Sequence, residues 1–189
     1  MRSACAMLAI AVVGTCASIV WAADTKAIRI GVRTETIGPW RVQGNSSLAG
    51  AIAAFGAPSR CRKVSGLPGF ASVEWQALGL RAVFGTYGSG GARPCQAVHT
   101  VRLDNARTSS KDWVTGRGLR VGDSVAKLRR LYPQATLRTY ARGVAPARGW
   151  WLVVRTSRVP DLHSVPALLA TARAGRVTSF VVSVHDEGA

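Results

Sequence analysis

The stretch of sequence that decides the predicted fold is GLRVGDSVAKLRRLYPQA, residues 118–135. Its first residues alternate apolar and polar side chains, as at the end of a strand, and Gly122 permits a sharp exit. Asp123 or Ser124 can then cap a helix, because their side-chain oxygens accept from the free N–H groups of its first turn. Pro133 ends the helix, since proline has no N–H with which to continue it.

The predicted helix has one apolar stripe. Val125, Leu128 and Tyr132 fall on a single helical face, so we expect Leu128 to lie in the core. Arg129 borders this stripe and Arg130 faces away from it, in the last turn, where positive charge complements the helix dipole. The helix spans only about two turns, and a helix of that length needs packing against other elements to persist.

An earlier segment matches this one in residue type and in order. Residues 47–55 repeat the cap and the apolar positions of residues 124–132, and a strand-like segment precedes each of the two predicted helices. Strand-like segments also follow them, at residues 97–103 and 177–184. Four matching elements in the same order indicate an internal repeat.

We therefore expect an α+β fold of two tandem repeats, each a short helix packed on an antiparallel β-meander, with the two units sharing or abutting one sheet. Residues 23–110 hold an N-terminal strand and the first repeat, and residues 111–189 hold the second. Within the second repeat, we predict a loop over residues 142–148, which contain Pro146.

The N-terminus predicts export. An apolar run over residues 4–13 and small residues around Ala22 define a signal peptide over residues 1–22, cleaved after Ala22. Cleavage before Cys16, as in a lipoprotein, is disfavoured because Thr15 is large for such a site. No later segment has the length and apolarity of a bilayer span, so we expect a secreted or cell-surface-associated protein.

Cleavage would leave two cysteines, Cys61 and Cys95. In an oxidising compartment these most simply form one disulfide bond. Neither cysteine has a CxxC partner and His99 is the only nearby histidine, so we expect no metal site. The glycine-rich residues 85–94 lack the lysine and the helix of a phosphate cradle, and we expect no cofactor.

The formal net charge of +16 favours anionic partners such as wall polymers or lipid headgroups. However, the basic residues are mostly arginine, are dispersed along the chain and accompany abundant alanine, glycine and valine, a composition that a GC-rich genome alone would encode. We expect an envelope protein or an anionic wall polymer as the partner, and not a nucleic acid.

The sequence contains no HExxH or GxSxG motif and no pair of acidic residues placed as in a glycosidase. Its histidines are His99 in a strand-like pattern, His163 in a predicted loop and His185 near the C-terminus. Because a catalytic triad needs no fixed sequence order, Asp123 and Ser124 with the distant His99 are the one set to test. A helix cap and a strand histidine explain the same residues.

Adjacent tryptophans provide a candidate binding surface. Trp150 and Trp151 lie in a predicted strand, so their rings must point to opposite faces of the sheet. Unless both faces are covered, one ring is available as an interface anchor. We select Trp151, with the neighbouring arginines Arg148, Arg155 and Arg158.

The segments GLRVGDSVAKLRRLYPQA, GWWLVV, AGRVTSFVVSV and GLRAVF resemble a family of uncharacterised secreted actinobacterial proteins, over most of the mature chain. This resemblance implies export and no known activity. More distantly, a repeated helix and meander is similar to small envelope and inhibitor modules of the BamE and β-lactamase-inhibitor type, at the level of fold only. Those modules have two helices per unit, whereas one is predicted here.

The sequence thus predicts a secreted non-catalytic binding module of the cell envelope or exterior. The alternative is a cell-envelope hydrolase with an unrecognised site. The two differ in whether the fold gathers a histidine, a nucleophile and an acid into one pocket.

Overall fold

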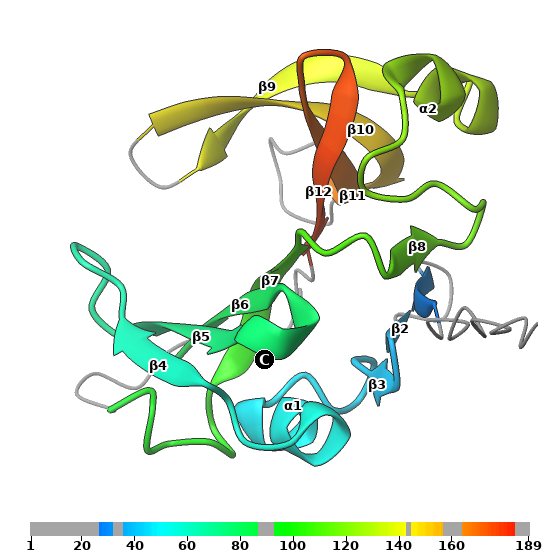
Figure 1. The fold of residues 1–189 in the computed structure, drawn as a ribbon. Coiled ribbons are helices and arrows are strands. Elements are labelled where there is room, and N and C mark those ends of the chain that lie inside the picture. The colour runs from blue at the N-terminus through cyan, green and yellow to red at the C-terminus, as the bar shows by residue number, and fades with distance from the viewer. Residues whose placement is uncertain (1–26, 32–35, 87–92, 143–144, 157–163, 184–189) are drawn as a thin grey trace, which may run out of the picture.

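The computed structural model describes residues 27–31, 36–86, 93–142, 145–156 and 164–183 (Figure 1). Their helices are α1 (Leu48–Phe55), α2 (Val125–Leu131) and the 3-10 turn η1 (Gln76–Leu78). The two α-helices contain eight and seven residues, whereas one strand alone contains twelve. The described chain is therefore mostly β.

Eight antiparallel strands form the larger sheet, in the order β4-β5-β6-β7-β12-β11-β10-β9. They are β4 (Arg60–Lys63), β5 (Phe70–Trp75), β6 (Leu80–Gly85), β7 (Arg102–Thr108), β9 (Thr136–Arg142), β10 (Ala145–Thr156), β11 (Ser164–Arg173) and β12 (Arg176–Ser183). Strands β7 and β12 lie side by side at the centre and join the early strands to the late ones (Figure 1).

A smaller sheet has the order β3-β2-β1-β8. Its strands are β1 (Ile28–Gly31), β2 (Thr36–Ile37), β3 (Trp40–Arg41) and β8 (Trp113–Thr115). Strands β1 and β8 run parallel, with Ile28 opposite Trp113. This pairing attaches the start of the described chain to its middle.

The predicted α+β fold of two helix-on-meander repeats is wrong. Strands dominate, and the pairing of β7 with β12 makes one eight-stranded sheet instead of two helix-based units. The smaller sheet also crosses the predicted boundary, because β1 precedes residue 111 and β8 follows it.

Both helices and the smaller sheet pack on one face of the larger sheet, here called the core face. A row of opposed residues marks this face across the strands: Trp75, Leu80, Thr108, Phe180, Ala170 and Trp150, all of them buried. Phe55 of α1 lies 5.6 Å from the Trp75 ring, and Arg129 of α2 lies 5.0 Å from the Trp150 ring. From the smaller sheet, Trp40 packs 6.0 Å from Phe84.

Both helices begin where the sequence predicts. The Ser47 hydroxyl accepts from the Gly50 N–H, and the Ser124 hydroxyl accepts from the Lys127 N–H, each at 3.1 Å. These caps satisfy N–H groups that the first helical turn leaves without a backbone partner. Local signals were therefore sufficient to predict where the helices begin, although they did not predict the fold class.

The predicted strand over residues 97–103 is largely wrong, since β7 begins only at Arg102. Turns precede it: the Ala97 N–H donates to the Arg93 carbonyl at 2.9 Å, and the Thr100 N–H donates to the Ala97 carbonyl at 3.0 Å. Residues 142–148 are not a loop as a whole, because β10 begins at Ala145 and pairs with β9.

The predicted disulfide between Cys61 and Cys95 is confirmed. It ties β4, at one edge of the larger sheet, to the turns that precede β7. The predicted signal peptide and Cys16 lie outside the described residues. Across the described ranges, no helix has the length and apolarity needed to cross a membrane.

Replacing Leu128 with alanine should lower the free energy of unfolding by about 2–4 kcal/mol, because this α2 side chain is 0% exposed and its loss leaves a cavity. The matched change Arg130→Ala, on the exposed side of the same helix, should cost less than about 0.5 kcal/mol. Urea unfolding followed by circular dichroism measures both. Equal losses would contradict the helical register.

Candidate binding face

The face of the larger sheet opposite the core face is here called the outer face. A second row of opposed residues crosses it: Glu74, Arg81, Arg107, Val181, Leu169 and Trp151. Directly opposed residues of antiparallel strands point to the same side of a sheet, and successive residues alternate sides. Trp150 and Trp151 consequently lie on opposite faces.

Trp151 is half-buried on the outer face beneath an arginine. The Arg138 guanidinium lies 4.8 Å from the centre of the Trp151 ring, and its Nε donates to the Thr136 hydroxyl at 3.0 Å. The Trp151 Nε1 is buried and has no hydrogen-bond partner among the described residues. An indole N–H can only donate, and a buried donor without an acceptor is rare in folded proteins.

The structure separates the predicted arginine neighbours of Trp151. Arg148 is exposed, and because it lies two residues from Trp150 it shares the Trp150 side of the strand. Arg155 is half-buried opposite Val165, beyond two register shifts in β10. Arg158 lies outside the described residues. The arginine that contacts the ring is Arg138, which sequence reasoning missed.

The other half of the outer face is charged. Arg81 lies opposite both Glu74 on β5 and Arg107 on β7. The Arg81 guanidinium pairs with the Glu74 carboxylate at 2.5 Å, with 57% of the Arg81 side chain and 17% of the Glu74 side chain exposed.

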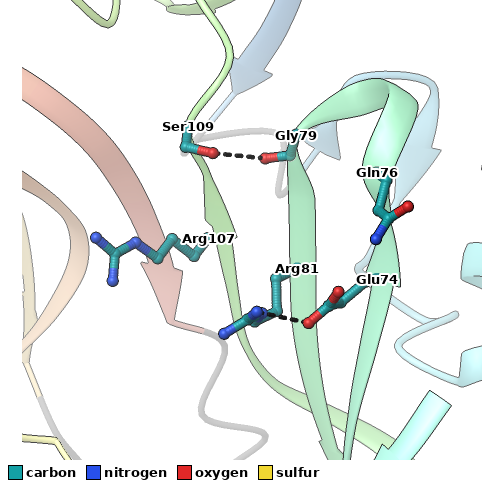
Figure 2. A pocket seen from close by; sticks show the side chains of 6 residues that line it. All are labelled: Glu74, Gln76, Gly79, Arg81, Arg107 and Ser109. Atoms are coloured by element: carbon teal, nitrogen blue, oxygen red, sulfur yellow. Dashed lines mark hydrogen bonds and ion pairs between the residues drawn. The ribbon is translucent and has the colours of Figure 1, made fainter. Parts of the chain in front are cut away.

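A hollow of about 380 Å³ lies over these strands. Its lining residues are Glu74, Gln76, Gly79, Arg81, Arg107 and Ser109 (Figure 2). Figure 2 shows Arg81 pointing toward Glu74, whereas Arg107 extends away from that pair. The Ser109 hydroxyl donates to the Gly79 carbonyl at 3.4 Å.

The residues considered for a hydrolase serve other roles. The Asp123 carboxylate accepts from the Arg120 N–H at 2.7 Å and pairs with Lys127 at 2.9 Å, and Ser124 caps α2. His99 is exposed in a turn next to Val98, whose carbonyl accepts from Ala49 of α1. Aspartate and serine thus belong to the start of α2, whereas the histidine lies beside α1.

His163 and His185 lie outside the described residues. In the part of the chain that the structure describes, no group of three or more His, Cys, Asp and Glu residues could hold a metal ion. Burial raises the pKa of the Tyr132 hydroxyl, although hydrogen bonds with Thr115 and Arg117 and the Arg117 charge oppose this shift. A phenol with a raised pKa stays protonated at neutral pH and is not an activated nucleophile.

No protein-family model and no curated protein matches this chain. Among solved structures, the chain is similar to an extracellular protein containing a SCP domain from Bacillus anthracis str. Ames, with 12% sequence identity and a TM-score of 0.42. The match covers 72% of this chain and 42% of that one, so this chain spans less than half of the other protein's length. So weak a likeness supports no conclusion about fold or function.

Proposed function

We propose that this protein is a secreted, non-catalytic binding module of the cell envelope or exterior, and that its ligand docks on the outer face. The observation that carries the proposal is Trp151, a large half-buried ring on the sheet face opposite the helices, with the Arg138 guanidinium 4.8 Å from its centre. A docked partner would cover the exposed part of this ring and accept hydrogen bonds from the guanidinium above it.

The surroundings of Trp151 suit an anchor of this kind. Tryptophan and arginine are the residues most enriched at the energetic centres of interfaces, and Arg138 lies directly over the Trp151 ring. Stacking on the ring orients the guanidinium, which can still donate at its edge to a partner's oxygen. An envelope protein or an anionic wall polymer would offer such oxygens.

Export is the second part of the proposal. The disulfide between Cys61 and Cys95 supports it, because disulfides persist in oxidising compartments outside the cytoplasm. The signal-peptide pattern over residues 1–22 and the resemblance to secreted actinobacterial proteins agree with this location.

Retention of the purified protein on cell-envelope preparations tests the proposal. Trp151→Ala should weaken binding by about 2 kcal/mol or more, because truncating a central aromatic anchor removes its contacts. Leu137→Ala is the matched control: Leu137 lies on the same hairpin, opposite Trp150, and is 43% exposed, so its replacement should leave retention unchanged.

Salt distinguishes an anchored interface from diffuse charge. Exposed charges are screened within about 8 Å at physiological ionic strength, so attachment through dispersed arginines should vanish at moderate salt. We expect a shallow salt dependence instead. Retention that is lost at moderate salt but is unchanged by Trp151→Ala would refute the proposed docking face. The absence of retention under any condition would refute it as well.

A further inference from the structure

Strand β9 forms one edge of the larger sheet, and among the described strands only β10 pairs with it (Figure 1). The seven residues of β9 pair with β10 without a register shift. Residues 136–139 are all exposed. An edge strand presents a row of N–H and C=O groups that can pair with a further strand, so β9 is a candidate docking edge.

Pro146 shows which backbone groups of β9 point outward. Proline has no N–H, so Pro146 and its partner Ala141 cannot form a pair that exchanges both hydrogen bonds. Since the two kinds of pair alternate along an antiparallel ladder, residues 137, 139 and 141 direct their N–H and C=O groups away from β10. Among the described residues, nothing hydrogen-bonds to these groups of residues 137 and 139.

The other edges are less suited to strand addition. Before the pairing of β10 with β11 begins at Trp150, β9 and β10 form a ribbon of two strands, which a third strand would stabilise. Pro146 interrupts the donors on the β10 side of this ribbon, whereas β9 contains no proline. At the opposite edge of the sheet, β4 has only four residues, and all except Cys61 are basic. Short, charged or proline-containing edges resist strand addition, so β9 is the edge that can accept a strand.

The arginines near this edge lack a neighbouring carboxylate. No aspartate or glutamate occurs in residues 124–160, and among the described residues no carboxylate forms an ion pair with Arg138 or Arg148. Because the backbone of Arg138 bonds to β10, an added strand would face Arg138 in a non-hydrogen-bonded pair, in which side chains lie closest. Opposite charges across such a pair stabilise it. A second copy of β9 would bring arginines and no carboxylate, so charge favours an acidic strand.

We propose that an extended segment of an envelope protein, with acidic side chains at alternate positions, adds to the larger sheet as a strand beside β9. The outward backbone groups of residues 137, 139 and 141 provide the main-chain hydrogen bonds that give affinity in this binding mode, and the acidic side chains provide specificity. These side chains lie on the outer face, where Arg138 stacks on Trp151. The inference rests on the proposed function, and it selects a protein over a wall polymer as the ligand.

Hydrogen exchange measured by two-dimensional NMR on the disulfide-intact protein tests this edge. The probe is a capped seven-residue peptide, the length of β9, that alternates glutamate and threonine. We expect saturable binding and slower exchange at the amides of residues 137, 139 and 141, because only these N–H groups gain a partner. The amides of residues 138 and 140 already bond to β10 and should change little. A control peptide with glutamine in place of glutamate should bind about tenfold more weakly.

Thr139→Pro removes the central outward donor but keeps the hydrogen bonds between β9 and β10, as Pro146 does on the other strand. It should weaken binding of the glutamate peptide about tenfold or more. Thr139→Val and Leu137→Ala keep their N–H groups and should bind this peptide within about twofold of the natural protein. Arg138→Gln should reduce the preference for the glutamate peptide while the alternating protection remains, and this variant provides the second test if Thr139→Pro fails to fold.

No saturable binding, equal binding of the two peptides, or protection that does not alternate along β9 would overturn the acidic strand. Protection of the same amides that grows with protein concentration alone would identify a second copy as the occupant, and it would overturn the proposal as well.

The exchange and retention assays separate the two proposals. Alternating protection by the glutamate peptide, without any envelope retention, would support the docking edge and refute the envelope as the source of the segment. Retention that depends on Trp151, with no binding of the peptide, would refute the docking edge alone.

Discussion

Replacing Trp113 with alanine should lower the free energy of unfolding by about 3–5 kcal/mol, as for other fully buried tryptophans. Trp113 is 0% exposed, and its Nε1 donates to the Leu78 carbonyl at 2.7 Å. Truncation would create a cavity between the two sheets and remove the donor from that carbonyl. Strand β8, which carries Trp113, also pairs with β1, so the change should loosen the N-terminal strand as well.

Urea unfolding monitored by circular dichroism measures this effect. Trp113→Phe keeps most of the ring but not the N–H, and it should lose clearly less stability than the alanine variant. Leu67→Ala, at a side chain that is 44% exposed, should change stability by less than about 0.5 kcal/mol. A loss at Trp113 no larger than the loss at Leu67 would show that Trp113 does not link the two sheets.

The helices could be predicted because their signals are local. Ser47 and Ser124 cap the first turns, and apolar side chains recur at helical spacing after each of them. The hairpin between β11 and β12 is local in the same way: Ala174 and Gly175 adopt positive φ angles between the opposed residues Arg173 and Arg176. Such elements depend on a few neighbouring residues, which the sequence displays directly.

The fold class could not be predicted, because it depends on pairings between distant segments. Nothing local in β7 or β12 specifies that they pair. Strands β1 and β8 also pair, in parallel, although nearly the whole of the first predicted unit separates them in the sequence. Both pairings require loop closure over long chain segments, which a local pattern does not encode. Pro146 misled the prediction in a different way: it lies in a stretch of β10 that pairs with β9, before the pairing with β11 begins at Trp150.

The candidate site was only partly predictable for the same reason. Alternation along a strand is enough to place Trp150 and Trp151 on opposite faces, but it does not identify what lies across from them. Arg138 reaches Trp151 through the register of β9 against β10, and Arg81 meets Arg107 through the register of β6 against β7. No local signal identified Arg138, because the pairing of Arg142 with Ala145 that sets this register begins in a stretch that the sequence predicts as a loop.

Removing the disulfide should cost about 3–4 kcal/mol in the chain-entropy model, for a loop between cysteines 34 positions apart. The bond limits the unfolded chain, and in the folded protein it ties the edge strand β4 to the turns before β7. Both cysteines pack against the core, so alanine at both positions also removes some apolar contact. We therefore expect Cys61→Ala/Cys95→Ala to unfold at a clearly lower urea concentration than the oxidised protein.

Reductant provides the internal control for this comparison. Dithiothreitol should destabilise the natural protein by about the amount that the double substitution costs, and it should leave the double variant unchanged, because that variant has no bond between residues 61 and 95 to reduce. Thiol titration of the exported protein, denatured without reductant, should find both cysteines blocked. Two reactive thiols there, or a double variant as stable as the oxidised protein, would contradict a stabilising bond between Cys61 and Cys95 and would remove one of the supports for export.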